Sequence, residues 1–342
     1  MSVAAHPQPE APPLPREIQL EVTGACNLRC RMCLVRYRPP LGRRTASLDL
    51  ALFRRVVDAL PDLERVTLQG LGEPLLAPDL VAMVAYAAGR GIRVGFNTNG
   101  TLLTRERARD LIAAGLAWLH VSIDGATEAT YEGIRDGSSL ARVQANVASL
   151  MEEIAGSGRG LPDVSLVFVA MRRNVRELPD VVRLAATWGV PRLHVQNLSH
   201  SFSDTSPESA YREIRDFFDA EALWPSPPGE REASIAFAAA RRAAEECGIE
   251  LHLPRLESEP AARAPGSPGC DWPWRSSYVR HDGRVQPCCM LMGDDRAIQG
   301  SVATHEFQEV WRGSAYASFR AQLEGSEPPA VCRGCALYQG VF

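Results

Sequence analysis

Cys26, Cys30 and Cys33 stand within eight residues of one another, directly after an apolar, strand-like stretch. Their CX3CX2C spacing suits a four-iron cluster better than zinc, because a structural zinc site is closed by four ligands that usually come as two CX2C-type pairs. A cluster held by three thiolates keeps one iron open for a substrate or cofactor. The alternative is a set of buried cysteines without metal, but short cysteine clusters in a reduced chain favour metal binding.

A second set of four cysteines lies near the end of the chain. These are Cys270, Cys288, Cys332 and Cys335. Taken alone, they fit a structural zinc site as well as an iron–sulfur cluster. Two cysteines remain: Cys247 fits a small buried apolar side chain, whereas Cys289 fits a core residue, a substitute ligand or a thiol facing the active site.

The composition is that of an ordinary globular protein. The 342 residues are 45% hydrophobic and 23% charged, with a formal net charge of −4. Such a chain can form one large core and a smaller module, and its charge predicts neither nucleic acid nor a membrane as a partner. No apolar run approaches the roughly 20 residues that span a bilayer. Because no secretion signal is visible, the nine cysteines indicate a cytoplasmic protein.

Strand-like and helix-like segments alternate from residue 17 to residue 198. The expected strands are Glu17–Val22, Arg65–Gln69, Ile92–Asn97, Trp118–Ile123, Val164–Met171 and Arg192–Leu198. The expected helices are Asp49–Leu60, Pro78–Gly89, Thr104–Ala114, Ser139–Ile154 and Val175–Trp188. Six such units predict a parallel sheet, either as a doubly wound sandwich or as a partial barrel. In both folds the functional loops lie at the carboxyl ends of the strands.

The remaining segments break this alternation. Residues 1–16 are proline-rich and predict a disordered lead. Residues 199–265 contain a Pro/Gly-rich break between two amphipathic helices, near 207–222 and 230–247, and predict a helical connector. Residues 266–342 predict a smaller module, with a hairpin at Asp282-Gly283 and a helix over His305–Leu323.

The cysteine run resembles that of radical S-adenosylmethionine (SAM) enzymes. The four later cysteines resemble the twitch module, a shortened SPASM domain that follows the barrel in many of these enzymes. The resemblance covers residues 17–198 and 266–342. It implies an α/β fold, a partial (β/α)6 TIM-like barrel followed by a small α+β iron–sulfur domain.

The resemblance also implies three cofactors. One is a 4Fe–4S cluster on Cys26, Cys30 and Cys33, and the second is S-adenosyl-L-methionine chelated to the open iron of that cluster. The third is one auxiliary 4Fe–4S cluster on the four later cysteines.

Residues that contact SAM follow from the same resemblance. Met32 holds the apolar position that packs near the adenine. Gly72 and Glu73 match the end of the family's Gly-Gly-Glu motif, which binds the SAM amino group, although Leu71 replaces the first glycine. Without the resemblance, Gly-Glu-Pro is simply a turn.

Three further positions follow the later strands. Asn97 lies at an edge that faces the active-site cavity in relatives, and Ser122 matches a serine that touches SAM. Arg135 matches an arginine that pairs with the SAM carboxylate, a task for which the guanidinium fork is suited. Taken alone, these are an Asn-Gly turn, a strand end and a solvated arginine.

The activity implied is reductive cleavage of SAM to a 5′-deoxyadenosyl radical that abstracts hydrogen from a substrate. We expect a small-molecule substrate, oxidised in secondary metabolism and resembling a sugar or aminocyclitol, and a reducing partner such as flavodoxin or ferredoxin. Redox-neutral epimerisation, with Cys289 as hydrogen donor, and peptide modification are the enzymatic alternatives. A zinc-stabilised binding protein is the non-catalytic alternative, which an iron and sulfide assay distinguishes.

Overall fold

The computed structural model describes residues 12–37, 47–158, 160–256, 270–291 and 296–342. Most of the expected N-terminal lead and the first residues of the expected C-terminal module lie outside these ranges.

Ten strands form one sheet in the order β10-β9-β8-β1-β2-β3-β4-β5-β6-β7. Their bounds are β1 (Glu17–Leu20), β2 (Arg65–Thr67), β3 (Arg93–Thr98), β4 (Trp118–Ser122), β5 (Asp163–Val169), β6 (Arg192–Gln196), β7 (Glu250–His252), β8 (Tyr278–Val279), β9 (Arg284–Gln286) and β10 (Gly300–Ser301). Neighbours from β8 through β1 to β7 are parallel, whereas β9 pairs antiparallel with both β8 and β10.

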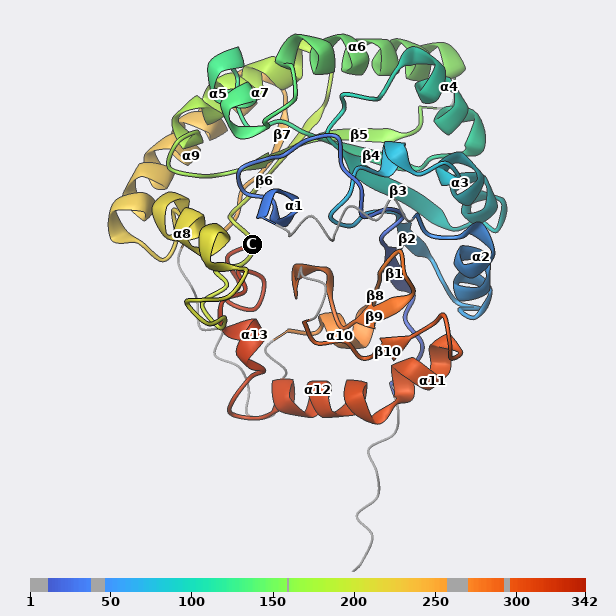
Figure 1. Ribbon diagram of the computed structural model, residues 1–342. Helices are drawn as coiled ribbons and strands as arrows, with labels where there is room; N and C mark the ends of the chain where they lie inside the picture. The colour runs from blue at the N-terminus through green and yellow to red at the C-terminus, as the bar shows by residue number, and fades with distance from the viewer. Residues whose placement is uncertain (1–11, 38–46, 159, 257–269, 292–295) are drawn as a thin grey trace, which may run out of the picture.

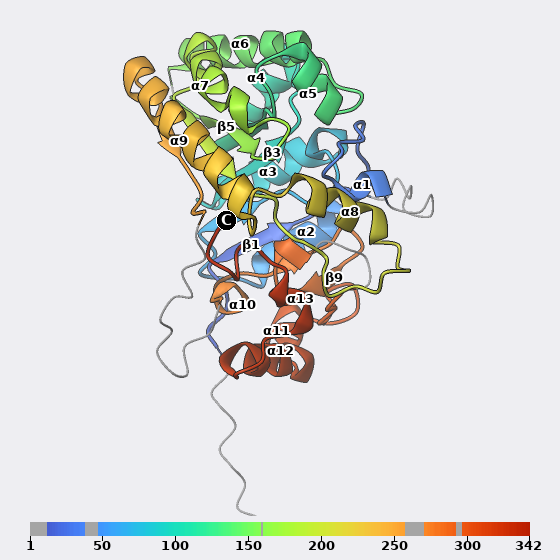
Figure 2. The ribbon, with the colours of Figure 1, turned by 90° about the vertical axis from the view of Figure 1, so that its left-hand side faces the viewer.

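Helices connect and cover these strands. They are α1 (Leu34–Tyr37), α2 (Leu50–Asp58), α3 (Leu80–Gly89), α4 (Arg105–Ala114), α5 (Glu128–Ile134), α6 (Leu140–Ser157), α7 (Leu178–Thr187), α8 (Arg212–Glu221), α9 (Pro227–Cys247), α10 (Trp272–Arg275), α11 (Phe307–Arg312), α12 (Ser314–Glu324) and α13 (Ala330–Arg333). Figure 1 shows α2–α4, α6, α7 and α9 outside the curved sheet and the C-terminal elements across its open side. Figure 2 shows α1 beside α8 at the edge of the molecule. The fold is therefore the expected partial barrel followed by a small C-terminal domain.

The inner and outer faces of the barrel follow from the alternation of side chains along each strand. In β4, Leu119 and Val121 are fully buried in the main hydrophobic core beneath the helices. Their neighbours His120 and Ser122 therefore point to the opposite, inner face. Each of the six expected barrel strands is present, within a few residues of its expected ends.

Two features of the sheet were not expected from the sequence. β7 lies within the expected connector and pairs with β6 as a seventh parallel strand. In addition, β8 pairs directly with β1, so that the C-terminal hairpin continues the barrel sheet. The expected helix over His305–Leu323 is also divided, because Gly313 is extended between α11 and α12.

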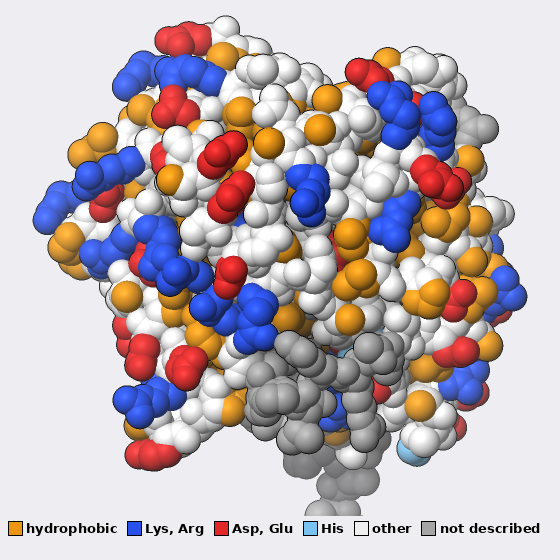
Figure 3. Space-filling view, turned by 45° about the horizontal axis from the view of Figure 1, so that its top comes forward, with side chains coloured by type: hydrophobic (Ala, Val, Ile, Leu, Met, Phe, Trp, Pro, Cys, Tyr) orange, Lys and Arg blue, Asp and Glu red, His pale blue; other side chains and the backbone are white. Residues whose placement is uncertain are grey.

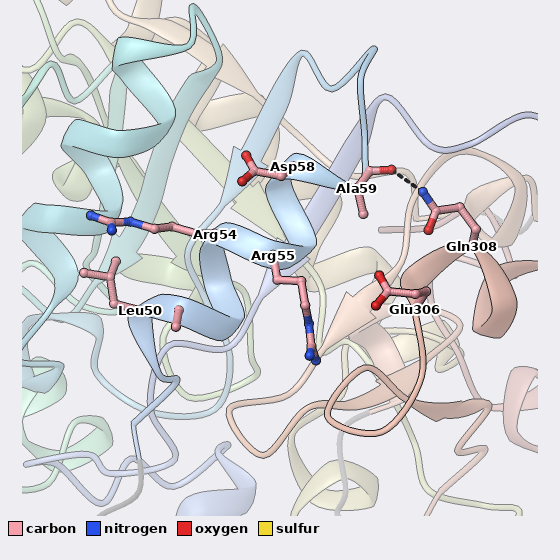
Figure 4. Close-up of a pocket in the computed structure, with 8 residues that line it drawn as sticks. Leu50, Arg54, Arg55, Asp58, Ala59, Glu306 and Gln308 are labelled. Carbon is pink, nitrogen blue, oxygen red and sulfur yellow. Dashed lines mark hydrogen bonds between the residues drawn. The ribbon is translucent and has the colours of Figure 1, made fainter.

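The C-terminal domain packs against the outer side of the barrel as well. Figure 4 shows a surface pocket between α2 and α11, where Gln308 Nε2 donates to the Ala59 carbonyl at 2.7 Å. Nearby, the Arg55 guanidinium donates to the Val302 carbonyl. None of the eight residues that line this pocket is a predicted site residue. Figure 2 shows α11 and α12 at the opposite end of the molecule from α6.

A row of stacked rings crosses the inner face of the sheet. The His120 ring lies 4.7 Å from Trp118 and 5.4 Å from His194, and His194 stacks on His252 at 4.5 Å. The Arg65 guanidinium lies over the Trp118 ring at 4.6 Å. Burial is the main reason that the pKa of His120 falls to about 3, and the nearby His194, Arg65 and Arg192 lower it further. His120 is therefore neutral in the folded protein at neutral pH.

Candidate active site

The three N-terminal cysteines lie on one loop at the carboxyl end of β1. Backbone hydrogen bonds hold this loop, from Arg29 N to the Asp136 carbonyl at 3.0 Å and from Arg31 N to the Ile134 carbonyl at 2.9 Å. Asn27 fixes the loop from the other side, because its amide donates to Thr101 Oγ1 at 2.8 Å. The loop is thus held between the segment after α5 and the segment after β3.

Gly72 brings a second loop into close contact with the cysteine loop. A Cβ atom at Gly72 would lie 2.1 Å from the Thr23 carbonyl oxygen and 2.6 Å from that of Ala25. The next residue, Glu73, donates its backbone N–H to the Ala25 carbonyl at 2.8 Å. Only glycine fits at position 72, because any side chain would separate the two backbones.

The Glu73 carboxylate is buried and accepts three hydrogen bonds. Thr98 Oγ1 donates to Oε1 at 2.6 Å, Leu75 N donates to Oε1 at 3.2 Å, and Asn99 N donates to Oε2 at 2.8 Å. Burial raises the pKa of Glu73, although these three donors oppose the shift. A carboxylate has about four acceptor positions, so one position on Oε2 remains for a further donor.

Arg135 is buried beside the cysteine loop and forms an ion pair. Its Nη2 lies 2.7 Å from Asp124 Oδ2, and its Nη1 donates to Cys30 Sγ at 3.9 Å. Burial opposes the charge on this guanidinium, but the Asp124 carboxylate outweighs burial and raises the pKa of Arg135. Among the described residues, Arg135 Nε has no hydrogen-bond acceptor. This buried donor suits an anionic group of a bound cofactor.

The cysteine thiols themselves sit in a poorly solvated environment. Burial raises the pKa of Cys26 to about 11, although the hydrogen bond that Leu28 N donates to its sulfur lowers this pKa. Burial also raises the pKa of Cys30, and the nearby Arg135 only partly offsets this. Ionising such thiols requires a strong positive partner, which iron provides.

The other predicted SAM contacts lie around this loop. Met32 is partly buried and packs against a small hydrophobic cluster that includes Ile134, Met171 and Phe218. Asn97 in β3 and Ser122 at the end of β4 are both partly exposed on the inner face of the sheet. The fold therefore gathers these three residues, Gly72, Glu73 and Arg135 at the carboxyl edge where the cysteine loop lies.

The second cysteine set comes together from three segments. Cys288 and Cys335 share one small hydrophobic cluster, and Cys332 is buried in a neighbouring one. The pKa of Cys288 is raised well above its usual value. Burial is the largest cause, and the nearby cysteines, including Cys270, add to it. Ser201 N donates to the Gly334 carbonyl at 2.9 Å, which ties this segment to the chain after β6.

Two spare cysteines occupy different environments. Cys289 is half-buried in the short helix η4 (Cys289–Leu291) and packs at the edge of the cluster that contains Cys288. Burial raises the pKa of Cys289 to about 12. Cys247 is partly exposed at the last position of α9.

No group of three or more His, Cys, Asp or Glu side chains in the described part of the chain lies closely enough to hold a single metal ion. The ligands of a polynuclear cluster bind different irons and need not converge on one point. A donor set of thiols alone is typical of iron–sulfur clusters.

Several residues that build the site were not identified from the sequence. Asn27, Thr98 and Asp124 fix the loops, although nothing in their spacing distinguishes them from turn residues. Of the three, Asp124 has the clearest signal in the sequence, because it is an ionisable residue that directly follows an apolar strand. In the structure it is fully buried. Such a residue usually has a charged partner.

The surface carries charges of both signs. Figure 3 shows basic and acidic side chains interspersed over one face of the molecule. This agrees with exposed ion pairs such as Arg176–Glu232 and Arg36–Asp136. Among the helices that the structure describes, none has both the length and the apolar composition of a membrane span.

Comparison with known proteins identifies the class. The model of the radical SAM superfamily matches residues 20–185, and the model of the SPASM iron–sulfur cluster-binding domain matches residues 270–336. The chain belongs to the radical SAM superfamily and carries a C-terminal SPASM-type iron–sulfur domain. It is an enzyme of this class, with a 4Fe–4S cluster and SAM in the barrel and an auxiliary iron–sulfur centre in the C-terminal domain.

Individual relatives align over nearly the whole chain. The tungsten-containing aldehyde ferredoxin oxidoreductase cofactor-modifying protein of Pyrococcus furiosus is 26% identical, over 94% of this chain and 87% of its own. The AdoMet-dependent heme synthase of Nitratidesulfovibrio vulgaris is also 26% identical, over 97% of this chain and 92% of its own. Among solved structures, Streptococcus suis SuiB bound to its precursor peptide SuiA has a TM-score of 0.67 at 14% identity, covering 96% of this chain and 71% of SuiB.

Proposed function

We propose that this enzyme oxidises a small-molecule substrate, with Cys26, Cys30 and Cys33 as the ligands of the SAM-binding cluster. The observation that carries this proposal is the cysteine loop, which is held between the turn at Gly72 and the buried Arg135. When bound, SAM and the cluster supply the 5′-deoxyadenosyl radical that removes a hydrogen atom from the substrate.

The residues around the loop fit SAM in distinct ways. The Arg135 Nε–H would donate to the SAM carboxylate, because it is buried and has no acceptor among the residues that the structure describes. The remaining acceptor position of Glu73 would take the SAM ammonium, while its three other bonds keep the turn rigid. Met32 would contact the adenine, and Asn97 and Ser122 would line the cavity on the inner face.

The C-terminal cysteines hold the auxiliary centre. We assign one 4Fe–4S cluster to Cys270, Cys288, Cys332 and Cys335, because burial and mutual proximity favour a shared cationic ligand over four neutral thiols. This centre supplies a one-electron acceptor when present. We assign residues 17–198 to the barrel, 199–265 to the connector and 266–342 to the auxiliary domain. The connector contributes β7 to the sheet.

The substrate class rests on the relatives. Two proteins that align with almost the full chain are named for heme synthesis and for cofactor modification, which favours a small, cofactor-like substrate. We also retain a sugar- or aminocyclitol-like compound as a smaller candidate substrate. Arg29 and Arg31 are exposed on the cysteine loop and suit an acidic reductant such as flavodoxin or ferredoxin.

Peptide modification is the second candidate, because the fold matches SuiB with its precursor peptide. To distinguish the two, the anaerobically reconstituted enzyme is incubated with SAM and dithionite, and 5′-deoxyadenosine is quantified with panels of tetrapyrroles, aminocyclitols and short peptides. We expect at least tenfold stimulation by a member of a small-molecule panel. Stimulation by peptides alone would contradict the proposal.

A further inference from the structure

We propose that His281, oriented by Glu21, is the proton-transfer residue of this active site and accepts the proton that the substrate loses on oxidation. This inference rests on the proposed function. No sequence pattern indicated a role for His281 or Glu21.

Glu21 points to the inner face of the barrel. It follows β1 directly, and its neighbours Leu20 and Val22 both belong to the hydrophobic core beneath the helices. The alternation of side chains therefore turns Glu21 to the opposite face. Only 1% of this residue is exposed, so its carboxylate depends on partners within the protein.

Three groups donate to the Glu21 carboxylate. Tyr278 Oη donates to Oε2 at 2.6 Å, Leu71 N donates to Oε2 at 3.1 Å, and His281 Nδ1 lies 2.5 Å from Oε1. Burial raises the pKa of Glu21. The hydrogen bond from His281, the positive charge that His281 carries when protonated, and the bonds from Tyr278 and Leu71 N outweigh burial and lower this pKa to about 2. The carboxylate is therefore ionised and accepts from both sides.

His281 lies at the same edge of the sheet as the cysteines. It follows β8, which is parallel to β1. Both strands therefore end at the carboxyl edge of the sheet, where the cysteine loop lies. The ring packs against the loop itself, because a Cβ atom at Gly24 would lie 2.9 Å from His281 Cε1. Gly24 stands two residues before Cys26, and the imidazole is thus beside the loop that carries the cluster ligands.

The hydrogen bond to Glu21 determines the chemistry of the ring. An ionised carboxylate can only accept, so the proton of the neutral imidazole resides on Nδ1. Nε2 then carries the lone pair and can accept a proton, after which the Glu21 carboxylate stabilises the imidazolium. A buried carboxylate behind a histidine performs this task in hydrolases.

The substrate of such an oxidation carries an H–C–X–H group, where X is oxygen or nitrogen. The C–H and X–H bonds break and a C=X bond forms, which releases one hydrogen atom, one electron and one proton. The hydrogen atom leaves to the 5′-deoxyadenosyl radical and the electron to the auxiliary iron–sulfur centre. The proton passes to His281 Nε2.

The test uses the holoenzyme and diethyl pyrocarbonate, which acylates an unprotonated imidazole nitrogen. We expect His281 to be labelled at Nε2 in the wild type, as measured by mass spectrometry. In Glu21→Gln, the donors Tyr278 and Leu71 N hold the amide oxygen, so that the amide NH2 faces Nδ1. This forces the proton to Nε2, and labelling of His281 should fall at least tenfold.

His252→Gln and Tyr278→Phe serve as comparisons. His252 is also paired with a glutamate, at 2.8 Å from Glu250, but lies on β7 and is half-exposed; its replacement should leave labelling of His281 unchanged. Tyr278→Phe keeps the Glu21 carboxylate and should keep the labelling. A wild-type His281 that stays unlabelled while His252 reacts would overturn the inference, as would equal labelling in Glu21→Gln.

Histidine 15N spectra of the same samples give the tautomer directly, with the proton on Nδ1 in the wild type and on Nε2 in Glu21→Gln. A wild-type Nε2–H tautomer would also overturn the inference. Formation of 5′-deoxyadenosine from SAM in these samples tests the proposed function separately, because SAM cleavage does not require proton transfer by His281.

Discussion

The Arg135 guanidinium and the Asp124 carboxylate form a buried ion pair, with 2.7 Å between Nη2 and Oδ2. The pair connects the end of α5 to the end of β4, and Asp124 Oδ1 also accepts from Val169 N in β5 at 2.8 Å. Through Cys30 Sγ, the same guanidinium reaches the cysteine loop. The pair therefore fixes the position of Arg135 before SAM binds.

Removing one member of this pair should be costly. We expect Asp124→Asn to lower the free energy of unfolding by about 3–5 kcal/mol, because it leaves the Arg135 charge buried without its partner. Urea unfolding measures this. Asp136→Asn is the matched control, since it breaks the exposed Arg36–Asp136 pair and should cost about 1 kcal/mol or less. Equal costs for the two variants would contradict our account of the pair.

The auxiliary cysteines should affect iron content more than SAM cleavage. We expect Cys332→Ala or Cys335→Ala to lose about half of the bound iron, because one cluster loses a ligand while the barrel cluster is untouched. Iron and sulfide analysis of anaerobically purified protein measures this. Cys247→Ala should retain the wild-type content. A wild-type protein with iron for a single cluster would contradict the auxiliary assignment.

Cys289 distinguishes oxidation from epimerisation. Oxidation requires no hydrogen donor, so Cys289→Ala should leave the reaction intact and no solvent deuterium should enter the product at carbon. The measurement is mass spectrometry of the product formed in deuterated water, once a substrate is identified. If deuterium enters the product of the wild type but not that of Cys289→Ala, the enzyme is an epimerase and the proposed oxidation is wrong.

His120 should make stability depend on pH. Its pKa is about 3 in the folded protein and 6.5 when unperturbed, so between these values the unfolded chain binds a proton that the folded chain does not. Stability is therefore highest above pH 6.5 and falls as the pH drops toward 3. We expect the wild type to lose about 2 kcal/mol more than His120→Gln between pH 7 and pH 5.

Urea unfolding of the wild type and of His120→Gln at the two pH values tests this prediction. A His120→Gln variant with the wild-type dependence on pH would show that burial of this imidazole does not control it.

Local patterns predicted most of the barrel. Each of the six expected strands is short and carries apolar residues on its core side, and such segments are recognisable because that side of every strand must be apolar. β7 was missed because Glu250 and His252 are polar and only Leu251 packs against the core. A strand of three residues, two of them polar, cannot be distinguished from a loop by its sequence.

The contacts between the two domains could not be predicted in the same way. Glu21 and His281 are 260 positions apart, and their hydrogen bond depends on the pairing of β1 with β8. That pairing places a hairpin from the C-terminal domain beside the first barrel strand. Local propensity gives no information about such a long-range register, so the sequence predicted candidate cluster ligands and SAM contacts within its motifs but not the pair formed by Glu21 and His281.

The central claim is that Cys26, Cys30 and Cys33 hold the cluster at which SAM is cleaved. The most direct measurement is formation of 5′-deoxyadenosine by the reconstituted protein with SAM and dithionite, compared with the variant in which all three cysteines are alanine. We expect the wild type to form it and the variant to form none above the protein-free background. A triple variant that still forms 5′-deoxyadenosine at the wild-type rate would contradict the account.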